Sequence, residues 1–163
     1  MIAILQRVRE AAVTIAGERT ASCGQGFLVL LGVAVGDTEE DARLLADKNA
    51  ALRVFEDENG KMNRSLADIG GSILVVPNFT LLASCRRGTR PDFMGAARPE
   101  QASPLFDTFF SYISEKVPHA ERGVFGAEMM VSLLNDGPIT IPIDSESLKQ
   151  PKSAKRGHHD SEN

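Results

Sequence analysis

The sequence predicts a single α+β domain with two helices and a curled, β-barrel-like sheet of antiparallel or mixed strands. Its 163 residues suit one domain, and 42% apolar with 25% charged residues is an ordinary globular composition. About six segments have the apolar, β-branched character of strands, whereas two have helical spacing. Because the two helices stand apart among the strands, the pattern is typical of an α+β fold.

The first three strands are expected in the first 35 residues. Residues 2–8 (IAILQRV) and 11–17 (AAVTIAG) are apolar segments separated by Arg9 and Glu10. They read as successive strands, joined through a bulge or a tight hairpin. Residues 26–35 form a continuous apolar run between two glycines, which indicates a buried strand.

Helical spacing appears twice. In residues 37–55, Asp37 or Thr38 is the expected N-cap, acidic residues fill the first turn, and Ala42, Leu45 and Asn49 share one face. The second helix is expected over 103–118, with Ser103 as N-cap and Pro104 at the first helical position. Its apolar stripe consists of Leu105, Phe106, Phe109, Phe110, Ile113 and Val117.

Two prolines interrupt the remaining strands. Residues 71–83 read as a buried strand, and Pro77 marks a bulge or the end of that strand because proline costs a ladder hydrogen bond. Residues 127–135 and 138–144 read as two strands joined by a turn at Asp136-Gly137-Pro138. A stiff Gly-Pro pair without a proline N–H is an unusual choice for a simple turn.

The predicted domain ends at residue 144. Residues 145–163 contain two apolar residues, Leu148 and Ala154, and cannot bury enough surface to order themselves. We expect a disordered polar tail. Its basic middle part, residues 149–156, is either a solvated linker or a weak tether for RNA.

Charge and histidine content limit the function. A net charge of −4 and a pI of about 5.4 argue against a general nucleic-acid coat. No apolar run approaches 18 residues, and charged residues interrupt the N-terminal segment, so we expect a cytoplasmic protein with free thiols at Cys23 and Cys85. His119 alone falls within the predicted domain, which argues against a histidine-based triad or metal site.

Taken one by one, the candidate sites leave alternatives open. Thr80 follows a strand disturbed by Pro77, where backbone N–H groups could face a ligand, but threonine is also an ordinary strand residue. Cys85 lies beside Arg86 and Arg87, which favour a thiolate, although it is also consistent with a plain loop thiol. The same arginines with Arg90 could bind phosphate.

Six short words in order carry a more specific signal. They are LQRV, LRVFEDENGK, PNFTL, RRGTRPDF, GVFGAEM and NDGPIT, and the resemblance that they carry covers roughly residues 1–144. In order and spacing the chain resembles the D-aminoacyl-tRNA deacylase family. The resemblance implies a homodimer that hydrolyses the ester between a D-amino acid and the 3′-terminal adenosine of tRNA. It also implies removal of glycine from mischarged tRNA-Ala, without metal or other cofactor.

The resemblance gives the Gly-Pro pair a role. It implies that the Gly137-Pro138 peptide is cis and reaches from one subunit into the active site of the other, with Arg7 bracing it. Backbone carbonyls can hold an α-amino group whatever the side chain is, while an L-side chain would collide with them. By this reading the pair is a rigid probe of chirality.

The resemblance also assigns the remaining residues. Backbone N–H groups near Phe79 and Thr80 stabilise the oxyanion, the vicinal 2′-hydroxyl of the tRNA assists, and Thr80 has a positioning role. Phe125 is expected to stack on the terminal adenine, with plain core packing as the alternative. Catalysis is thus expected from Asn78, Phe79 and Thr80, substrate binding from Pro77, Phe125, Gly126 and Met129, and acceptor-stem phosphate binding from Arg86, Arg87 and Arg90.

One word departs from the family pattern. The family has Ser-Gln where this chain has Pro77-Asn78, so proline replaces a hydroxyl and asparagine is one methylene shorter. The departure leaves two alternatives, a relaxed pocket or a non-catalytic tRNA-binding dimer. A thiol hydrolase using Cys85 is a third. The expected partners are aminoacylated tRNA and a second copy of the chain, with neither membrane nor DNA.

Overall fold

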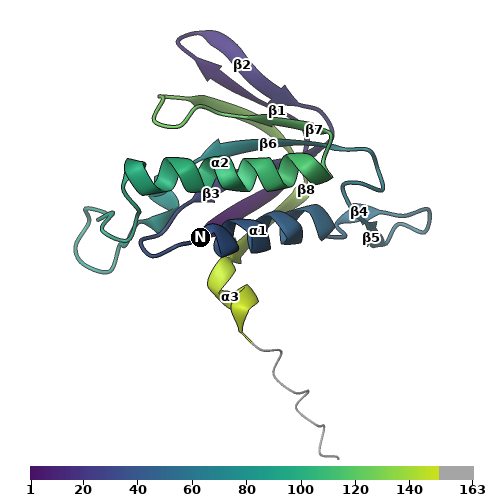
Figure 1. The fold of residues 1–163 in the computed structure, drawn as a ribbon. Helices are drawn as coiled ribbons and strands as arrows, with labels where there is room; N and C mark the ends of the chain where they lie inside the picture. The colour runs from purple at the N-terminus through teal and green to yellow at the C-terminus, as the bar shows by residue number, and fades with distance from the viewer. Residues whose placement is uncertain (151–163) are drawn as a thin grey trace, which may run out of the picture.

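The computed structural model describes residues 1–150, which form a curled main sheet covered on one face by helices and a small two-stranded sheet of β4 and β5 (Figure 1). The strands are β1 (Ile2–Ile15), β2 (Glu18–Cys23), β3 (Gly26–Gly32), β4 (Phe55–Glu56), β5 (Met62–Arg64), β6 (Ser72–Pro77), β7 (His119–Arg122) and β8 (Met130–Asp144). The helices are α1 (Glu39–Ala51), the 3-10 turn η1 (Phe79–Leu82), α2 (Pro99–Lys116) and α3 (Ser145–Lys149).

The main sheet is mixed, as predicted. Strand β1 pairs antiparallel with β3 along residues 2–8, with β2 along residues 11–15, and with β8 on its other edge. Strands β3, β6 and β7 follow as parallel neighbours. The sheet curls until β2 meets β7, where the Ser22 N–H donates to the Glu121 carboxylate at 2.6 Å. The predicted fold class, a curled and barrel-like sheet in one α+β domain, is confirmed.

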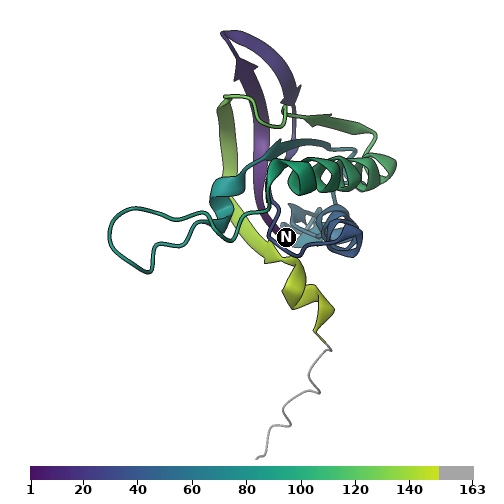
Figure 2. The same cartoon turned by 60° about the vertical axis from the view of Figure 1, so that its left-hand side comes forward.

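The largest core lies between this sheet and the helices. Helices α1 and α2 run side by side over one face of the sheet (Figure 2). Phe27 of β3, Leu45 of α1 and both Phe106 and Phe109 of α2 meet there, each at most 1% exposed. Leu28 points to the other face of the sheet, as the two-residue period of a strand requires. Within the described residues no helix has the length and apolar character needed to cross a membrane.

Two predicted pairs of strands are each one long strand. Residues 2–15 form β1 without a hairpin, because its two halves pair with different neighbours, β3 and β2. The predicted turn at Gly137-Pro138 is also wrong, since residues on both sides of it belong to β8 and pair with β1. The register of β1 with β8 shifts around Arg7, which accommodates the Gly-Pro segment as an irregularity within the ladder.

The second helix begins earlier than predicted. The carbonyl of Arg98 accepts the N–H groups of Gln101 and Ala102 at 3.0 and 2.8 Å, so α2 starts at Pro99 and Pro104 lies inside it. Pro99 and Pro104 both suit the first position of a helix, and α2 begins at Pro99.

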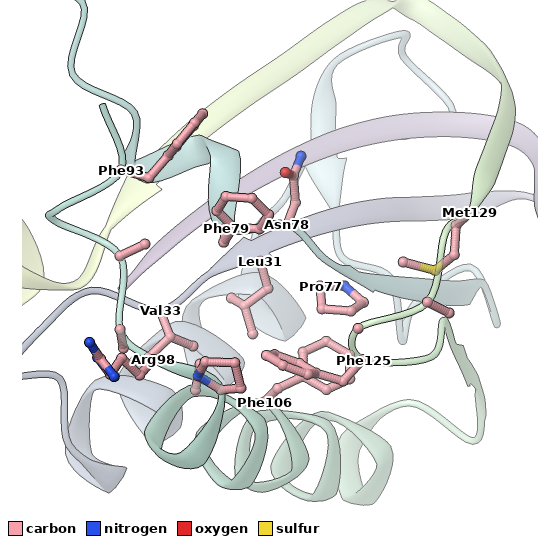
Figure 3. A pocket seen from close by; sticks show the side chains of 16 residues that line it. Leu31, Val33, Pro77, Asn78, Phe79, Phe93, Arg98, Phe106, Phe125 and Met129 are labelled. Carbon is pink, nitrogen blue, oxygen red and sulfur yellow. The ribbon is translucent and has the colours of Figure 1, made fainter. Parts of the chain in front are cut away.

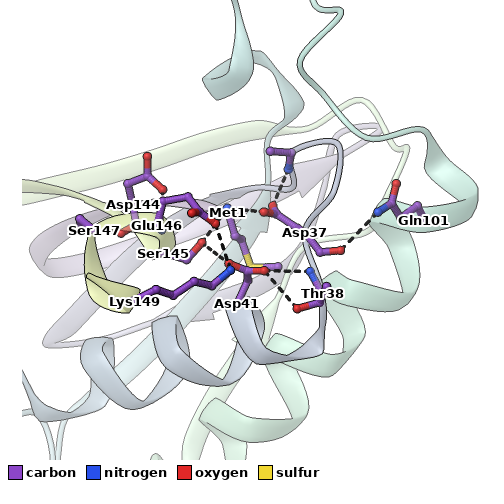
Figure 4. A network of polar contacts seen from close by, with 11 residues as sticks. Met1, Asp37, Thr38, Asp41, Gln101, Asp144, Ser145, Glu146, Ser147 and Lys149 are labelled. Carbon is purple, nitrogen blue, oxygen red and sulfur yellow. Dashed lines mark hydrogen bonds and ion pairs between the residues drawn. The ribbon is translucent and has the colours of Figure 1, made fainter. Parts of the chain in front are cut away.

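The predicted disordered tail begins too early. Residues 145–149 form α3, while residues 151–163 lie outside the described part of the chain. A polar network holds α3 against the domain (Figure 4). Ser145 is fully buried, donates to the Asp41 carboxylate at 2.6 Å and accepts from the amino group of Met1 at 2.9 Å. Buried polar contacts hold this segment, together with Leu148, which packs against the hydrophobic core.

Asp41 is the centre of the network. Its side chain, 1% exposed, accepts hydrogen bonds from Lys149 at 2.8 Å, from Ser145 and from the Thr38 N–H at 2.9 Å. Burial by itself raises the pKa of Asp41, but the hydrogen bonds from Lys149, Ser145 and Thr38 outweigh burial and hold the pKa well below its usual range. The carboxylate caps α1 and anchors α3 at once.

We expect Asp41→Asn to lower the free energy of unfolding at pH 7 by about 2 kcal/mol, because it removes a buried, paired charge. The pKa of Asp41 is lower in the folded state than its unfolded value of roughly 4. The charged carboxylate therefore stabilises the fold fully above roughly pH 4, and this contribution is lost as the pH falls through the folded-state pKa. Urea unfolding of both proteins at pH 7 and pH 3 should therefore show the difference shrinking in acid.

Glu146→Gln is the matched control for this network. Glu146 pairs with the same Lys149 at 3.0 Å, but its side chain is 68% exposed. Exposed ion pairs contribute little, so this variant should unfold like the wild type. Equal losses in the two variants would mean that removal of any negative charge near Lys149 matters, and that the buried position of Asp41 does not.

Candidate functional site

A cavity of about 500 Å³ opens where the end of β6, the segment before α2 and the segment before β8 meet (Figure 3). Its lining is mostly apolar. It consists of Leu31, Val33, Pro77, Asn78, Phe79, Phe93, Ala96, Ala97, Arg98, Pro99, Ala102, Phe106, Phe125, Gly126, Ala127 and Met129. A half-open apolar cavity with a few polar groups at its edge is the usual form of a small-molecule site.

The end of β6 sets the polar edge of this cavity. Pro77 ends the strand, as predicted, and the Asn78 N–H still bonds to the Leu31 carbonyl at 2.8 Å. The chain then turns into η1. The Asn78 side chain caps this turn, because its Oδ1 accepts the Thr80 N–H at 3.2 Å and also the Thr80 hydroxyl.

This capping engages the backbone N–H of Thr80 but not that of Phe79, although both are expected to stabilise the oxyanion. The N–H and hydroxyl of Thr80 are both engaged by Asn78, and Thr80 does not line the cavity. The Phe79 N–H, in contrast, donates no hydrogen bond to any acceptor in residues 1–150. Of the two expected oxyanion donors, the structure leaves one free, and it holds Thr80 in a position that supports the turn.

Aromatic rings form the walls of the cavity. Phe125 lies against Phe106 with ring centroids 6.4 Å apart, and Phe93 meets Phe79 edge-on at 5.1 Å. Four residues expected to bind substrate, Pro77, Phe125, Gly126 and Met129, line the cavity together with Asn78 and Phe79 (Figure 3). The structure thus brings together residues that are about 50 positions apart in the sequence.

The Gly137-Pro138 pair does not line this cavity. The peptide is cis, Gly137 has a φ of 140°, and the pair lies within β8. Arg7 contacts the residue before this pair. Its Nε donates to the Asp136 carbonyl at 3.0 Å and its Nη1 to the Val54 carbonyl at 2.7 Å. The bracing role that the family resemblance implies for Arg7 stays a prediction.

The predicted phosphate-binding arginines lie on an outward loop. Arg86, Arg87 and Arg90 are exposed between Ser84 and Asp92, whose backbones pair at the base of the loop. None of the three lines the cavity or forms an ion pair with a described acidic residue. Their cationic groups are therefore available to a ligand larger than the cavity.

The two cysteines are free. Cys85 is exposed on the basic loop and does not line the cavity, so the thiol-hydrolase alternative has no support from its position. Cys23 is buried, and burial raises its pKa to about 11, which keeps the thiol protonated. Residues 1–150 contain no cluster of three potential metal ligands.

Of the lining residues that the sequence does not assign to the site, three have aromatic or charged side chains: Phe93, Arg98 and Phe106. Phe106 was assigned to the core because it follows the helical stripe, and it serves both the core and the cavity. Phe93 stands in a recognisable word but carried no role. No sequence pattern indicates a role for Arg98, because its place at the cavity depends on the start of α2 at Pro99 and not at Pro104.

The family model for D-Tyr-tRNA(Tyr) deacylase matches residues 4–144. The chain belongs to the D-aminoacyl-tRNA deacylase family. A D-aminoacyl-tRNA deacylase from Thermus aquaticus is 56% identical over 145 residues, covering 89% of this chain and 95% of the relative. One from Chloroflexus aurantiacus is 53% identical over 154 residues, covering 94% and 96%.

Solved structures share the fold of this chain. A structure described as c-Myc DNA Unwinding Element Binding Protein has a TM-score of 0.84 and 39% identity, covering 88% of this chain and 98% of that one. A probable eukaryotic D-amino acid tRNA deacylase matches with a TM-score of 0.74 at 16% identity over the same shares, which shows a common fold. Family members are hydrolases of ester bonds, so this chain is an enzyme of that class.

Proposed function

We propose that this protein hydrolyses D-aminoacyl-tRNA to free tRNA and a D-amino acid. The observation that carries the proposal is the free Phe79 N–H at the edge of an aromatic cavity. The cavity suits the terminal adenosine of tRNA, with Phe125 stacking on the base, and the edge suits the ester beside it. No metal or other cofactor is required.

The mechanism follows from the weakness of the bond. An aminoacyl ester is already activated, and the vicinal 2′-hydroxyl of the ribose assists. Water adds to the ester carbonyl carbon, and the Phe79 N–H donates to the oxygen that becomes negative. The tetrahedral intermediate then collapses, its bond to the ribose oxygen breaks, and that oxygen takes up a proton. Asn78 and Thr80 hold the turn that aims the Phe79 N–H.

Chiral selection requires a second copy of the chain in this proposal. Gly137 and Pro138 do not line the cavity of their own subunit, so their carbonyls act in the cavity of the partner of a homodimer. Strand β8 suits such an interface. Met130, Leu133 and Leu134 expose 75%, 39% and 53% of their surface on it. The partner's carbonyls hold the α-amino group and leave no room for an L-side chain.

The proposed substrate range includes glycine, because a filter that excludes L-side chains has nothing to reject in glycyl-tRNA, such as glycine mischarged on tRNA-Ala. Arg86, Arg87 and Arg90 contact acceptor-stem phosphates in this scheme. The protein works in the cytoplasm on tRNA, with neither DNA nor a membrane as its partner. Asn78 caps η1 although it replaces the family's glutamine, which supports activity over the binding-only alternative.

Single-turnover hydrolysis of matched D- and L-tyrosyl-tRNA is the direct test. We expect fast release of D-tyrosine and negligible release of L-tyrosine by the purified protein. Similar rates for the two substrates would show that Pro77-Asn78 relaxes the pocket. Binding of D-tyrosyl-tRNA without release of tyrosine, from either this substrate or glycyl-tRNA, would replace the deacylase proposal by the binding-only alternative.

A further inference from the structure

Arg98 is the single charged side chain among the residues that line the cavity. It precedes α2 directly, as the N-cap residue before Pro99. In Figure 3 its guanidinium lies at the rim formed by the segment before α2, at the opposite end of the cavity from Met129. An exposed cation at the mouth of an otherwise apolar cavity is the feature to explain.

The backbone at Arg98 is fixed, whereas its side chain is free. The Ala97 N–H donates to the Val33 carbonyl at 2.9 Å, and the Arg98 carbonyl accepts the first two N–H groups of α2. The Arg98 guanidinium forms no ion pair or hydrogen bond with any group in residues 1–150. Arg7 and Arg122, in contrast, are engaged by Asp136 and Asp107.

We propose that Arg98 binds the phosphodiester that joins the terminal nucleotide of the substrate to the nucleotide before it. This inference rests on the proposed function, which places the terminal adenosine in the cavity. An apolar wall can accept the base but not the charged phosphate on the 5′ carbon, so that phosphate must stay at the rim. A guanidinium matches its oxygens with two parallel hydrogen bonds.

The position of Arg98 assigns it to the nucleotide end of the substrate. The ester is placed at the Phe79 N–H, beside Asn78, and Arg98 comes from a different wall of the cavity (Figure 3). Arg86, Arg87 and Arg90 lie on the outward loop and do not line the cavity, so they suit phosphates farther along the tRNA. Arg98 therefore distinguishes a nucleotide ester from a nucleoside ester.

Three substrates test this assignment in the full-length protein. They are D-tyrosyl-tRNA, the D-tyrosyl ester of adenosine 5′-monophosphate, and the D-tyrosyl ester of adenosine without phosphate. We expect Arg98→Gln to lower kcat/KM about tenfold for the first two and to leave the third unchanged. The slope of log kcat/KM against log salt for the tRNA should also become shallower by about 0.7, the value for one phosphate contact.

Arg43→Gln is the charge-matched control. Arg43 lies on α1, pairs with Asp47 at 3.6 Å and does not line the cavity, so all three substrates should react as with the wild type. If Arg98→Gln slows all three esters alike, or slows the tRNA alone, Arg98 does not bind this phosphate and the inference fails. If the wild-type protein hydrolyses none of the three esters, the proposed function itself is wrong. A failure of the proposed function is thus distinguishable from a failure of the Arg98 assignment.

Discussion

Replacement of Phe79 by proline is expected to lower the rate of D-tyrosyl-tRNA hydrolysis by about 10² to 10³, the usual effect of losing one oxyanion donor. Proline deletes the backbone N–H that is free in the structure. The local backbone tolerates it, because Asn78 is extended (φ −148°, ψ 95°) and Phe79 is the first residue of a 3-10 turn. Stability should therefore change little.

Phe79→Ala separates the N–H from the ring. This variant keeps the backbone donor and removes a side chain that is 57% exposed. We expect kcat within about fivefold of the wild type, since the donor in the proposed transition state remains. Single-turnover rates and thermal melting of the two variants complete the comparison. An equal loss in both would assign the effect to the ring and remove the Phe79 N–H from the mechanism.

The Phe79→Pro variant also gives a test of the shared active site. Gly137→Ala distorts the segment that the chain is proposed to contribute to the active site of its partner. A Cβ on Gly137 lies 2.9 Å from the Ile139 nitrogen at a φ of 140°. Each variant alone should be impaired. A mixed dimer of the two contains one site with both features intact, so random mixing should restore about a quarter of wild-type activity. Absence of any recovery would mean that Gly137 acts within its own chain.

Local sequence signals predicted the parts of the site that depend on one segment. Pro77 ends β6 because proline cannot continue the ladder, and the capped start of α1 at Thr38 follows from its acidic first turn. Resemblance to a known family, and not spacing, connected the segments around Phe79 and Phe125. Their proximity comes from the pairing of β6 with β3 and β7, which no local pattern specifies.

The errors arose where long-range contacts override local preference. Gly137-Pro138 has the composition of a turn, but β8 pairs with β1 on both sides of it, so the segment is an irregularity within one strand. Residues 145–149 have the composition of a disordered tail, but Asp41 and Met1 lie where Ser145 can bond to both. Arg98 lines the cavity because α2 begins at Pro99, and local sequence does not decide between Pro99 and Pro104 as the first helical residue.

Gly26→Ala is expected to destabilise the protein more than any other single change considered, by about 4 kcal/mol. A Cβ on Gly26 lies 1.8 Å from the carbonyl oxygen of Ser72, its partner in the parallel pair of β3 and β6. The backbone at Gly26 has a φ of 155°, which disfavours alanine as well. Strand β6 must then move away from β3, and β6 leads directly into Pro77, Asn78 and Phe79.

Gly24→Ala, two residues earlier, is the control for this clash. Nothing lies within 4 Å of a Cβ on Gly24, so its free energy of unfolding should stay within about 0.5 kcal/mol of the wild type. Urea unfolding compares the two variants, and hydrolysis of D-tyrosyl-tRNA by the folded fraction reports on the site. Because the clash displaces the strand that carries the Phe79 N–H, the Gly26 variant should lose activity per folded molecule. Full activity in a destabilised Gly26 variant would show that the geometry of η1 does not depend on the pairing of β3 with β6.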